Sequence, residues 1–493
     1  MNKGQSVVAS AGLGVISCTA VAVPANAGQQ ANLPNIIFIM ADDLGYRELG
    51  CYGQKKIMTP NIDKMAAEGQ RWTQFYSGSA VCAPARCTLL TGMHGGHAYV
   101  RDNKEIKSKK TAKFDGIPPI HIFGGQAPMP GDAVKIVKAL KTKGYVTGCF
   151  GKWGLGAPGS ASDPLNVGFD RFYGYNCQRH AHELYPRYLV DDNKIQPLRG
   201  NVGRKQSQYA PLLIADELIK FVKLHKDDRF FIYYPTVLPH LPLSVPEEYR
   251  KMYDDKGWED PKTKCRAYGG SSAPKRTYAA MITFMDEQFG RLLDTLKKLG
   301  IDDNTIVFFT SDNGTTFIKG LVDYDFFKSV GNLKGLKGSL YEGGIREPMI
   351  IRWPGHIQPG TTTDMVSALY DIPATLADIA GVMDKIGKTD GVSLLPVIIG
   401  QPDKQKQHEF LFWDFAGYGG QIAVRMGKWK GIIRNIKKKP NVELELFNLE
   451  KDVREKHNVA ADHPEVVDKI KAIIRKERQK PEEPIFQFGK YGE

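Results

Sequence analysis

Asn35-Ile36-Ile37-Phe38-Ile39-Met40, followed at once by Ala41-Asp42-Asp43, is the stretch of this sequence that indicates a fold. An apolar run of this length is typical of a strand that is buried on both faces of a parallel sheet. The carboxyl edge of such a sheet is where α/β proteins place their ligands. The two acids follow the strand at this edge. They favour metal ligation over a solvated loop or a helix cap.

A second apolar run, at 305–310, ends in the same way, with Ser311-Asp312-Asn313-Gly314. The two strand ends together offer four oxygen-donor side chains: Asp42, Asp43, Asp312 and Asn313. Such donors suit a hard cation and do not suit zinc, which prefers nitrogen and sulfur ligands. We predict a Ca²⁺ site here, with Mg²⁺ as the alternative.

Strand and helix patterns alternate through the first 400 residues. Apolar runs predict further strands at 145–150, 229–234 and 348–353, and amphipathic spacing predicts helices at 60–68, 132–143, 212–224 and 278–299. Near residue 400 the character changes. Short strands are expected at 411–415, 421–433 and 444–452, followed by a basic amphipathic helix at 466–476.

Cys82 lies in a second informative stretch, Val81-Cys82-Ala83-Pro84-Ala85-Arg86-Cys87-Thr88-Leu89-Leu90-Thr91-Gly92. The proline-stiffened turn and the apolar run predict a loop that leads into a helix N-terminus, which favours anions. Lys152 follows a predicted strand among glycines, a setting that suits an oxyanion. His240 stands in Pro239-His240-Leu241-Pro242, where the prolines keep it out of regular structure. We expect the side chains of Lys152 and His240 to take part in binding or catalysis.

The Cys-x-Pro-x-Arg core followed by Leu-Leu-Thr-Gly resembles the signature of the formylglycine-dependent sulfatases, of the arylsulfatase and N-acetylgalactosamine-6-sulfatase type. Six motifs appear in the family's order between Asn35 and the C-terminus, including Lys334-Gly335-Leu336-Lys337-Gly338-Ser339-Leu340-Tyr341-Glu342-Gly343-Gly344-Ile345-Arg346. The resemblance implies the α/β fold of the alkaline phosphatase superfamily. That fold has a large, mostly parallel sheet sandwiched by helices, and a small C-terminal subdomain of antiparallel sheet plus helix.

The same resemblance implies a mechanism. Cys82 would be oxidised to a formylglycine, whose hydrate attacks the sulfur of a sulfate monoester. A formylglycine-generating enzyme or an anaerobic sulfatase-maturating enzyme would carry out this oxidation. The implied catalytic residues are Cys82, Arg86, Lys152, His240 and Lys337, and the implied metal ligands are Asp42, Asp43, Cys82, Asp312 and Asn313.

Gly154 stands where the family usually carries a histidine, two residues after the lysine. Because that histidine is thought to help expel sulfate, another group is needed. Candidates lie in Cys177-Gln178-Arg179-His180-Ala181-His182, where Arg179, His180 and His182 are predicted to bind substrate. Structural histidines are the alternative interpretation of this cluster.

Residues 1–27 have the features of a signal peptide: Lys3, an apolar segment at 7–23, and Ala25-Asn26-Ala27 as the cleavage site. Cys18 allows an alternative, because Val15-Ile16-Ser17-Cys18 is close to a bacterial lipoprotein box. We therefore expect an exported protein, periplasmic or secreted, with lipid anchoring through Cys18 as the alternative. The expected domains are the signal peptide at 1–27, a sulfatase catalytic domain at 28–400 and the C-terminal subdomain at 401–493.

The chain carries 67 Lys and Arg against 54 Asp and Glu, a net charge of +13 that attracts anions. No helix-turn-helix, zinc-finger or RNA-binding signature accompanies this charge, so we predict no nucleic-acid partner. Export and basic charge together favour sulfated polysaccharides or oligosaccharides as substrates over steroid or small aryl sulfates.

Two other functions stay open at this point. One is a phosphodiester or phosphonate hydrolase of the same superfamily, and the other is a non-catalytic sulfated-glycan-binding relative. The sequence does not show which sugar or sulfated position is recognised, or whether action is exo or endo. We expect the loops 101–113 and 178–187 to determine this recognition. Disulfide pairing and oligomeric state are equally unspecified.

Overall fold

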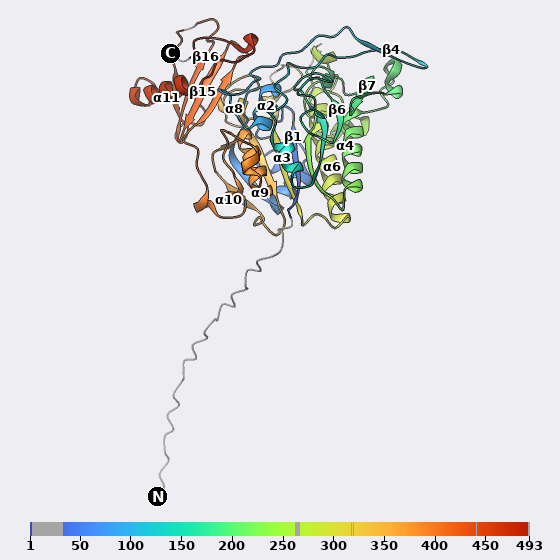
Figure 1. The fold of residues 1–493 in the computed structure, drawn as a ribbon, viewed down its shortest axis with the longest axis horizontal. Coiled ribbons are helices and arrows are strands. Elements are labelled where there is room, and N and C mark those ends of the chain that lie inside the picture. Colours follow the sequence, from blue (N-terminus) through green and yellow to red (C-terminus); the bar gives the residue numbers. More distant parts are fainter. Residues whose placement is uncertain (2–32, 262–266, 317, 319, 440, 492–493) are drawn as a thin grey trace. The chain divides into compact units, whose positions relative to one another are not determined.

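The computed structural model describes residue 1 and residues 33–491, except 262–266, 317, 319 and 440 (Figure 1). The predicted signal peptide and Cys18 lie outside the described residues. Within them, the main sheet has eleven strands. Its order is β12 (Thr361–Thr363), β2 (Gln70–Tyr76), β11 (Arg346–Arg352), β10 (Thr305–Ser311), β1 (Asn35–Ala41), β9 (Arg229–Pro235), β5 (Tyr145–Lys152), β6 (Arg171–Tyr175), β7 (Tyr188–Asp191) and β8 (Lys194–Pro197), and β13 (Ser367–Ala368) pairs with β2.

The centre of this sheet is parallel, as predicted. β1 pairs in parallel with β10 on one side and with β9 on the other, and β9 continues in parallel to β5 and β6. β11, β7 and β8 run antiparallel to their neighbours. In the β1–β10 register Ala41 lies opposite Ser311, so Asp42 and Asp312 leave the sheet side by side.

Successive side chains of β1 point to opposite faces of the sheet, and all of them are apolar from Ile36 to Ala41. Both faces therefore have to be covered, and helices cover them. Phe38 packs into a core with α2 (Cys82–Thr91), α3 (Ile136–Lys141) and α9 (Ile372–Ala380). Ile37 packs into a second core with α1 (Pro60–Glu68), α4 (Ala210–Leu224) and α6 (Pro274–Lys298). The predicted sandwich of a mostly parallel sheet between helices is confirmed.

The predicted antiparallel sheet near the C-terminus is also confirmed. β14 (Leu411–Phe415), β15 (Gln421–Met426), β16 (Trp429–Arg434) and β17 (Glu445–Asn448) form it in that order, and α11 (Pro464–Glu477) packs on β15 and β16. The boundary at residue 400 stays a prediction. We refer to this sheet and helix as the C-terminal subdomain.

The remaining strands and α-helices of the described residues are short. They are a hairpin of β3 (Thr111–Phe114) and β4 (Ile117–His121) and the helices α5 (Glu247–Lys251), α7 (Tyr324–Phe327), α8 (Glu342–Ile345) and α10 (Leu395–Ile398), and short 3₁₀ turns lie between the elements. Among the described residues, the structure has no helix with the length and apolar character needed to cross a membrane.

Candidate active site

The four predicted oxygen ligands of the metal lie together at the carboxyl edge of the sheet. Asp42 and Asp43 follow β1, Asp312 and Asn313 follow β10, and all four are at most 1% exposed. The Asp43 N–H donates to Asp312 Oδ1 at 3.1 Å, and Asn313 Nδ2 donates to Asp43 Oδ1 at 2.7 Å. Neighbouring strand ends thus create one cluster of oxygen donors.

Cys82 is the first residue of α2 and points into this cluster. Its Sγ lies 3.3 Å from Asp42 Oδ1 and 4.0 Å from Asp43 Oδ1. Burial, reinforced by the negative charge of Asp42, raises the pKa of the Cys82 thiol far above its ordinary value. An unmodified Cys82 therefore stays a neutral thiol, which is a poor nucleophile.

Each carboxylate has a cation of its own. Lys152 Nζ is 2.5 Å from Asp42 Oδ2, Lys337 Nζ is 2.8 Å from Asp43 Oδ2, and Arg86 Nη2 is 2.7 Å from Asp312 Oδ2. Lys337 Nζ also lies 3.6 Å from Cys82 Sγ. Three formal negative charges and three formal positive charges balance in this cluster.

The residues present fit a hard divalent cation. Asn313 Oδ1 is buried and accepts no hydrogen bond from any residue that the structure describes, so one oxygen donor is left available. Burial and the neighbouring Asp42 charge raise the pKa of Asp312 to about 7. Carboxylates crowded in this way repel one another until a cation is shared between them. The oxygen donors are of the kind that Ca²⁺ or Mg²⁺ takes.

His240 is held with a defined tautomer. Its Nδ1 lies 2.6 Å from the carbonyl oxygen of Leu241, which only accepts, so Nδ1 carries the hydrogen. Nε2 is then the free acceptor, and it lies 3.6 Å from Asp43 Oδ2. The His182 ring stacks on His240 with centroids 4.7 Å apart and 5° between the planes.

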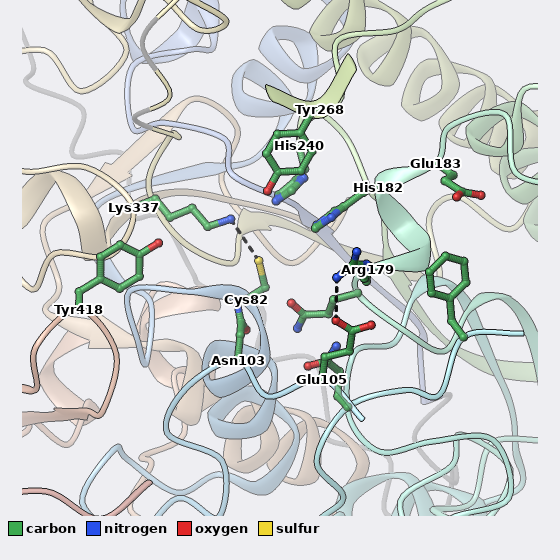
Figure 2. Close-up of a pocket in the computed structure, with 13 residues that line it drawn as sticks. Cys82, Asn103, Glu105, Arg179, His182, Glu183, His240, Tyr268, Lys337 and Tyr418 are labelled. Carbon is green, nitrogen blue, oxygen red and sulfur yellow. Dashed lines mark hydrogen bonds and ion pairs between the residues drawn. The ribbon is translucent and has the colours of Figure 1, made fainter. Parts of the chain in front are cut away.

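A cavity of about 660 Å³ opens above this cluster (Figure 2). It is lined by Cys82, Lys337, His240, His182 and Arg179 from the predicted set. Arg179 stands at its rim with a side chain that is 65% exposed, 3.4 Å from Glu105 Oε2. None of the described residues hydrogen-bonds to a ring nitrogen of His182, so both nitrogens are available to a ligand.

His180 does not line the cavity. It is 1% exposed and stacks on Tyr188 at 4.0 Å and on Phe123 at 4.9 Å between ring centroids. The 3₁₀ turn of His180–His182 puts the two histidine rings in different surroundings, whereas an extended segment would point both the same way. Of this pair, only His182 reaches the site.

The backbone explains why Gly154 carries no side chain. Its φ is +75°, which disfavours other residues, and a Cβ there would lie 2.9 Å from Gln178 Nε2. Gln178 lines the cavity beside it. The amide of Gln178 thus fills the space next to residue 154, and an amide does not accept a proton at neutral pH.

Seven further residues that the sequence did not single out individually line the cavity: Asn103, Glu105, Phe123, Gln126, Glu183, Tyr268 and Tyr418. Asn103 Oδ1 also accepts the Ala83 N–H at 2.9 Å, which ties its loop to the start of α2. Asn103 and Glu105 belong to the lysine-rich loop 101–113. We expect this loop to take part in recognition, but its run of lysines indicates only a surface segment and does not point to these two residues.

His180 makes stability depend on pH. Burial lowers the pKa of His180 from 6.5 to about 3, so below pH 6.5 the unfolded chain takes up a proton that the folded chain does not. This imbalance costs about 2 kcal/mol at pH 5. We expect His180→Phe to reduce the stability lost between pH 7.5 and pH 5 by about that amount, with activity retained. Denaturant unfolding at both pH values measures it, and equal losses in variant and wild type would contradict it.

Known proteins show clear similarity to this chain. Residues 34–382 match the family model described as sulfatase, and residues 336–480 match that of the N-sulphoglucosamine sulphohydrolase C-terminal region. The chain is 31% identical over 430 residues to arylsulfatase A of Homo sapiens, covering 81% of this chain and 75% of that protein. It is 28% identical over 521 residues to the N-acetylgalactosamine-6-O-sulfatase of Bacteroides thetaiotaomicron, covering 91% and 93%. The solved structure of Ps i-CgsB with k-i-k-neocarrahexaose matches with a TM-score of 0.72 and 28% identity, covering 91% and 94%.

Proposed function

Since this chain belongs to the sulfatase family and is a sulfuric ester hydrolase, we propose that it cleaves sulfate monoesters of polysaccharides or oligosaccharides through a formylglycine made from Cys82. Two similar proteins support the glycan assignment. One is named an N-acetylgalactosamine-6-O-sulfatase and the other was solved in complex with k-i-k-neocarrahexaose.

The placement of Cys82 is the observation that carries this proposal. Its Sγ is surrounded by carboxylates and by Lys337, yet burial keeps the thiol neutral. A cysteine that is positioned for catalysis but held in its unreactive form calls for chemical conversion. The hydrated aldehyde would supply a hydroxyl group as nucleophile, and a second hydroxyl whose deprotonation allows sulfate to leave.

Charge complementarity supports sulfate as the bound group. Asp42, Asp43, Asp312 and Asn313 would hold Ca²⁺ (or Mg²⁺), which would neutralise the sulfate oxygens and acidify the hydroxyl on residue 82. Because the cluster is balanced without a metal, a divalent cation leaves it with two positive charges. Lys152 and Lys337 then bind the sulfate oxygens, and Arg86 fixes the site by donating to Asp312 and to the Lys152 carbonyl oxygen.

We assign proton transfer to the two stacked histidines, His240 and His182. His240 presents Nε2 toward the cluster because Nδ1–H is bound to Leu241 O, and we assign it to the sulfate or the leaving-group oxygen. His182 lies against it with both ring nitrogens available, and we assign it to the substrate. We propose that one of these two histidines accepts the proton of the second hydroxyl on residue 82, the role that Gly154 cannot perform.

We further propose that the protein is exported, periplasmic or secreted, and meets a maturing enzyme before Cys82 is buried. Cys82 is 1% exposed in the folded chain, so an enzyme reaches it most easily before folding is complete. A signal peptide at 1–27 fits this order of events, and anchoring through Cys18 is the alternative.

The direct test is the mass of the tryptic peptide 72–86, which contains Cys82, from protein co-expressed with a maturing enzyme. We expect a loss of about 18 Da, the difference between thiol and aldehyde. An unmodified thiol in the presence of an active maturing enzyme would refute the formylglycine proposal. A converted peptide in a protein that hydrolyses no sulfated glycan would instead support the formylglycine proposal and refute the proposed substrate class.

A further inference from the structure

The C-terminal subdomain holds the backbone next to a sulfate-binding lysine. Gln421, the first residue of β15, donates from Nε2 to Gly338 O at 2.7 Å and accepts the Leu340 N–H on Oε1 at 3.2 Å. Its side chain is buried, with the residue only 4% exposed. Both hydrogen bonds go to the turn that directly follows Lys337.

That turn lies between the two loops that build the site. The Lys337 N–H donates to Thr315 O at 3.0 Å, in the segment after Asn313, and the Gly338 N–H donates to Ala80 O at 2.8 Å, two residues before Cys82. Backbone hydrogen bonds therefore attach the turn to the metal-ligand loop and to the nucleophile loop. Gln421 supplies the third attachment, from a different sheet.

The contact at Gly338 leaves little freedom. Gly338 has φ +85°, and a Cβ there would lie 2.9 Å from the ring of Tyr418, another subdomain residue that lines the cavity. The subdomain thus packs directly on the backbone that carries Lys337. A shift of the subdomain relative to this turn would move the base of the lysine side chain.

We propose that Gln421 is a positioning residue: it fixes the Gly338–Leu340 turn so that Lys337 Nζ meets the sulfate oxygens. The inference rests on the proposed sulfate-binding role of Lys337. A long lysine side chain has many rotamers, so its placement depends on a fixed backbone. The C-terminal subdomain is accordingly a part of the sulfate-binding site.

Gln421→Leu is the variant that tests this proposal. Leucine has a similar volume but leaves Gly338 O and the Leu340 N–H without their partner. The variant is expected to fold, because Lys430 still reaches Glu342 at 2.8 Å and Glu455 at 3.0 Å in a buried cluster that joins the subdomain to α8. We expect the dissociation constant for inorganic sulfate to rise about tenfold, measured by calorimetry on calcium-loaded, mature protein.

A double-mutant cycle separates positioning from general damage. If Gln421 acts through Lys337, Gln421→Leu weakens sulfate binding in the wild type and has no further effect in Lys337→Ala. Equal weakening in both backgrounds would overturn the proposal, as would unchanged sulfate affinity in the single variant.

Gln405→Leu is the matched control. Gln405 is also buried and also binds backbone, donating to Ser393 O at 2.8 Å and to Lys406 O at 2.9 Å, but it does not line the cavity. We expect both leucine variants to lower Tm, and only Gln421→Leu to weaken sulfate binding.

Because sulfate binding is measured without turnover, failure to hydrolyse a sulfated glycan would refute the proposed function and leave this result intact.

Discussion

Replacing Cys82 with alanine is expected to lower kcat/KM for sulfate-ester hydrolysis by at least about 10⁴-fold, the largest effect of any single change to this chain. The substitution removes the atom from which the nucleophile is made and leaves the surrounding cations in place. Sulfate binding should therefore persist, since Lys337 still lines the cavity and Lys152 still pairs with Asp42 in the charged cluster. Steady-state kinetics with a sulfated oligosaccharide and calorimetry with inorganic sulfate measure the two effects.

Cys87→Ala is the appropriate control for this experiment. Cys87 lies in the same helix, is also buried, and packs in the apolar core rather than at the cavity. Removing its sulfur costs packing but no chemistry, so Tm should fall slightly while kcat/KM stays within about twofold. Substantial activity in Cys82→Ala, or an equal loss in Cys87→Ala, would show that residue 82 is not the source of the nucleophile.

Local sequence patterns predicted the centre of the fold and the cluster of oxygen donors at its edge because both depend on short-range order. A buried strand followed by acids is visible in the sequence, and β1 and β10 are such strands. Parallel pairing then brings their ends together without further information, since Ala41 and Ser311 are in register. A different local pattern, a proline-stiffened turn before an apolar run, predicted a loop at Cys82 that leads into a helix, and the helix begins at Cys82 itself.

Side-chain direction in irregular segments was not predictable in this way. His180 and His182 are two residues apart, and only a 3₁₀ turn sends one into an aromatic core and the other into the cavity. Tyr418 and Gln421 are far from Lys337 in the sequence. Their contacts with Gly338, the residue after Lys337, depend on how the C-terminal sheet packs on the main sheet. Tertiary packing of this kind leaves no periodic signal in the chain.

Asp43→Asn is expected to weaken calcium binding by about 10²-fold or more and to lower kcat/KM by about 10³-fold. Asparagine suits this position because Asp43 has φ +65°, a left-handed conformation that asparagine tolerates better than most residues. The change therefore removes a charge with little backbone strain. It also leaves the Lys337 ammonium, 2.8 Å away, without its counter-charge in a buried site, so Tm should fall even without calcium.

Asp192→Asn provides the matched control, because Asp192 also has a left-handed backbone, with φ +55°, but lies at the turn between β7 and β8, away from the cavity. Its side chain is 40% exposed and pairs with Arg171, so losing its charge should cost little. Calcium titration by calorimetry and thermal unfolding with and without calcium compare the two variants. If the cluster of Asp42, Asp43, Asp312 and Asn313 binds the metal, only Asp43→Asn loses the calcium-dependent rise in Tm. Removing one of three carboxylates from a site of four oxygen donors must lower its affinity for a divalent cation. An equal calcium-dependent rise in the Tm of both variants would therefore show that the metal binds elsewhere.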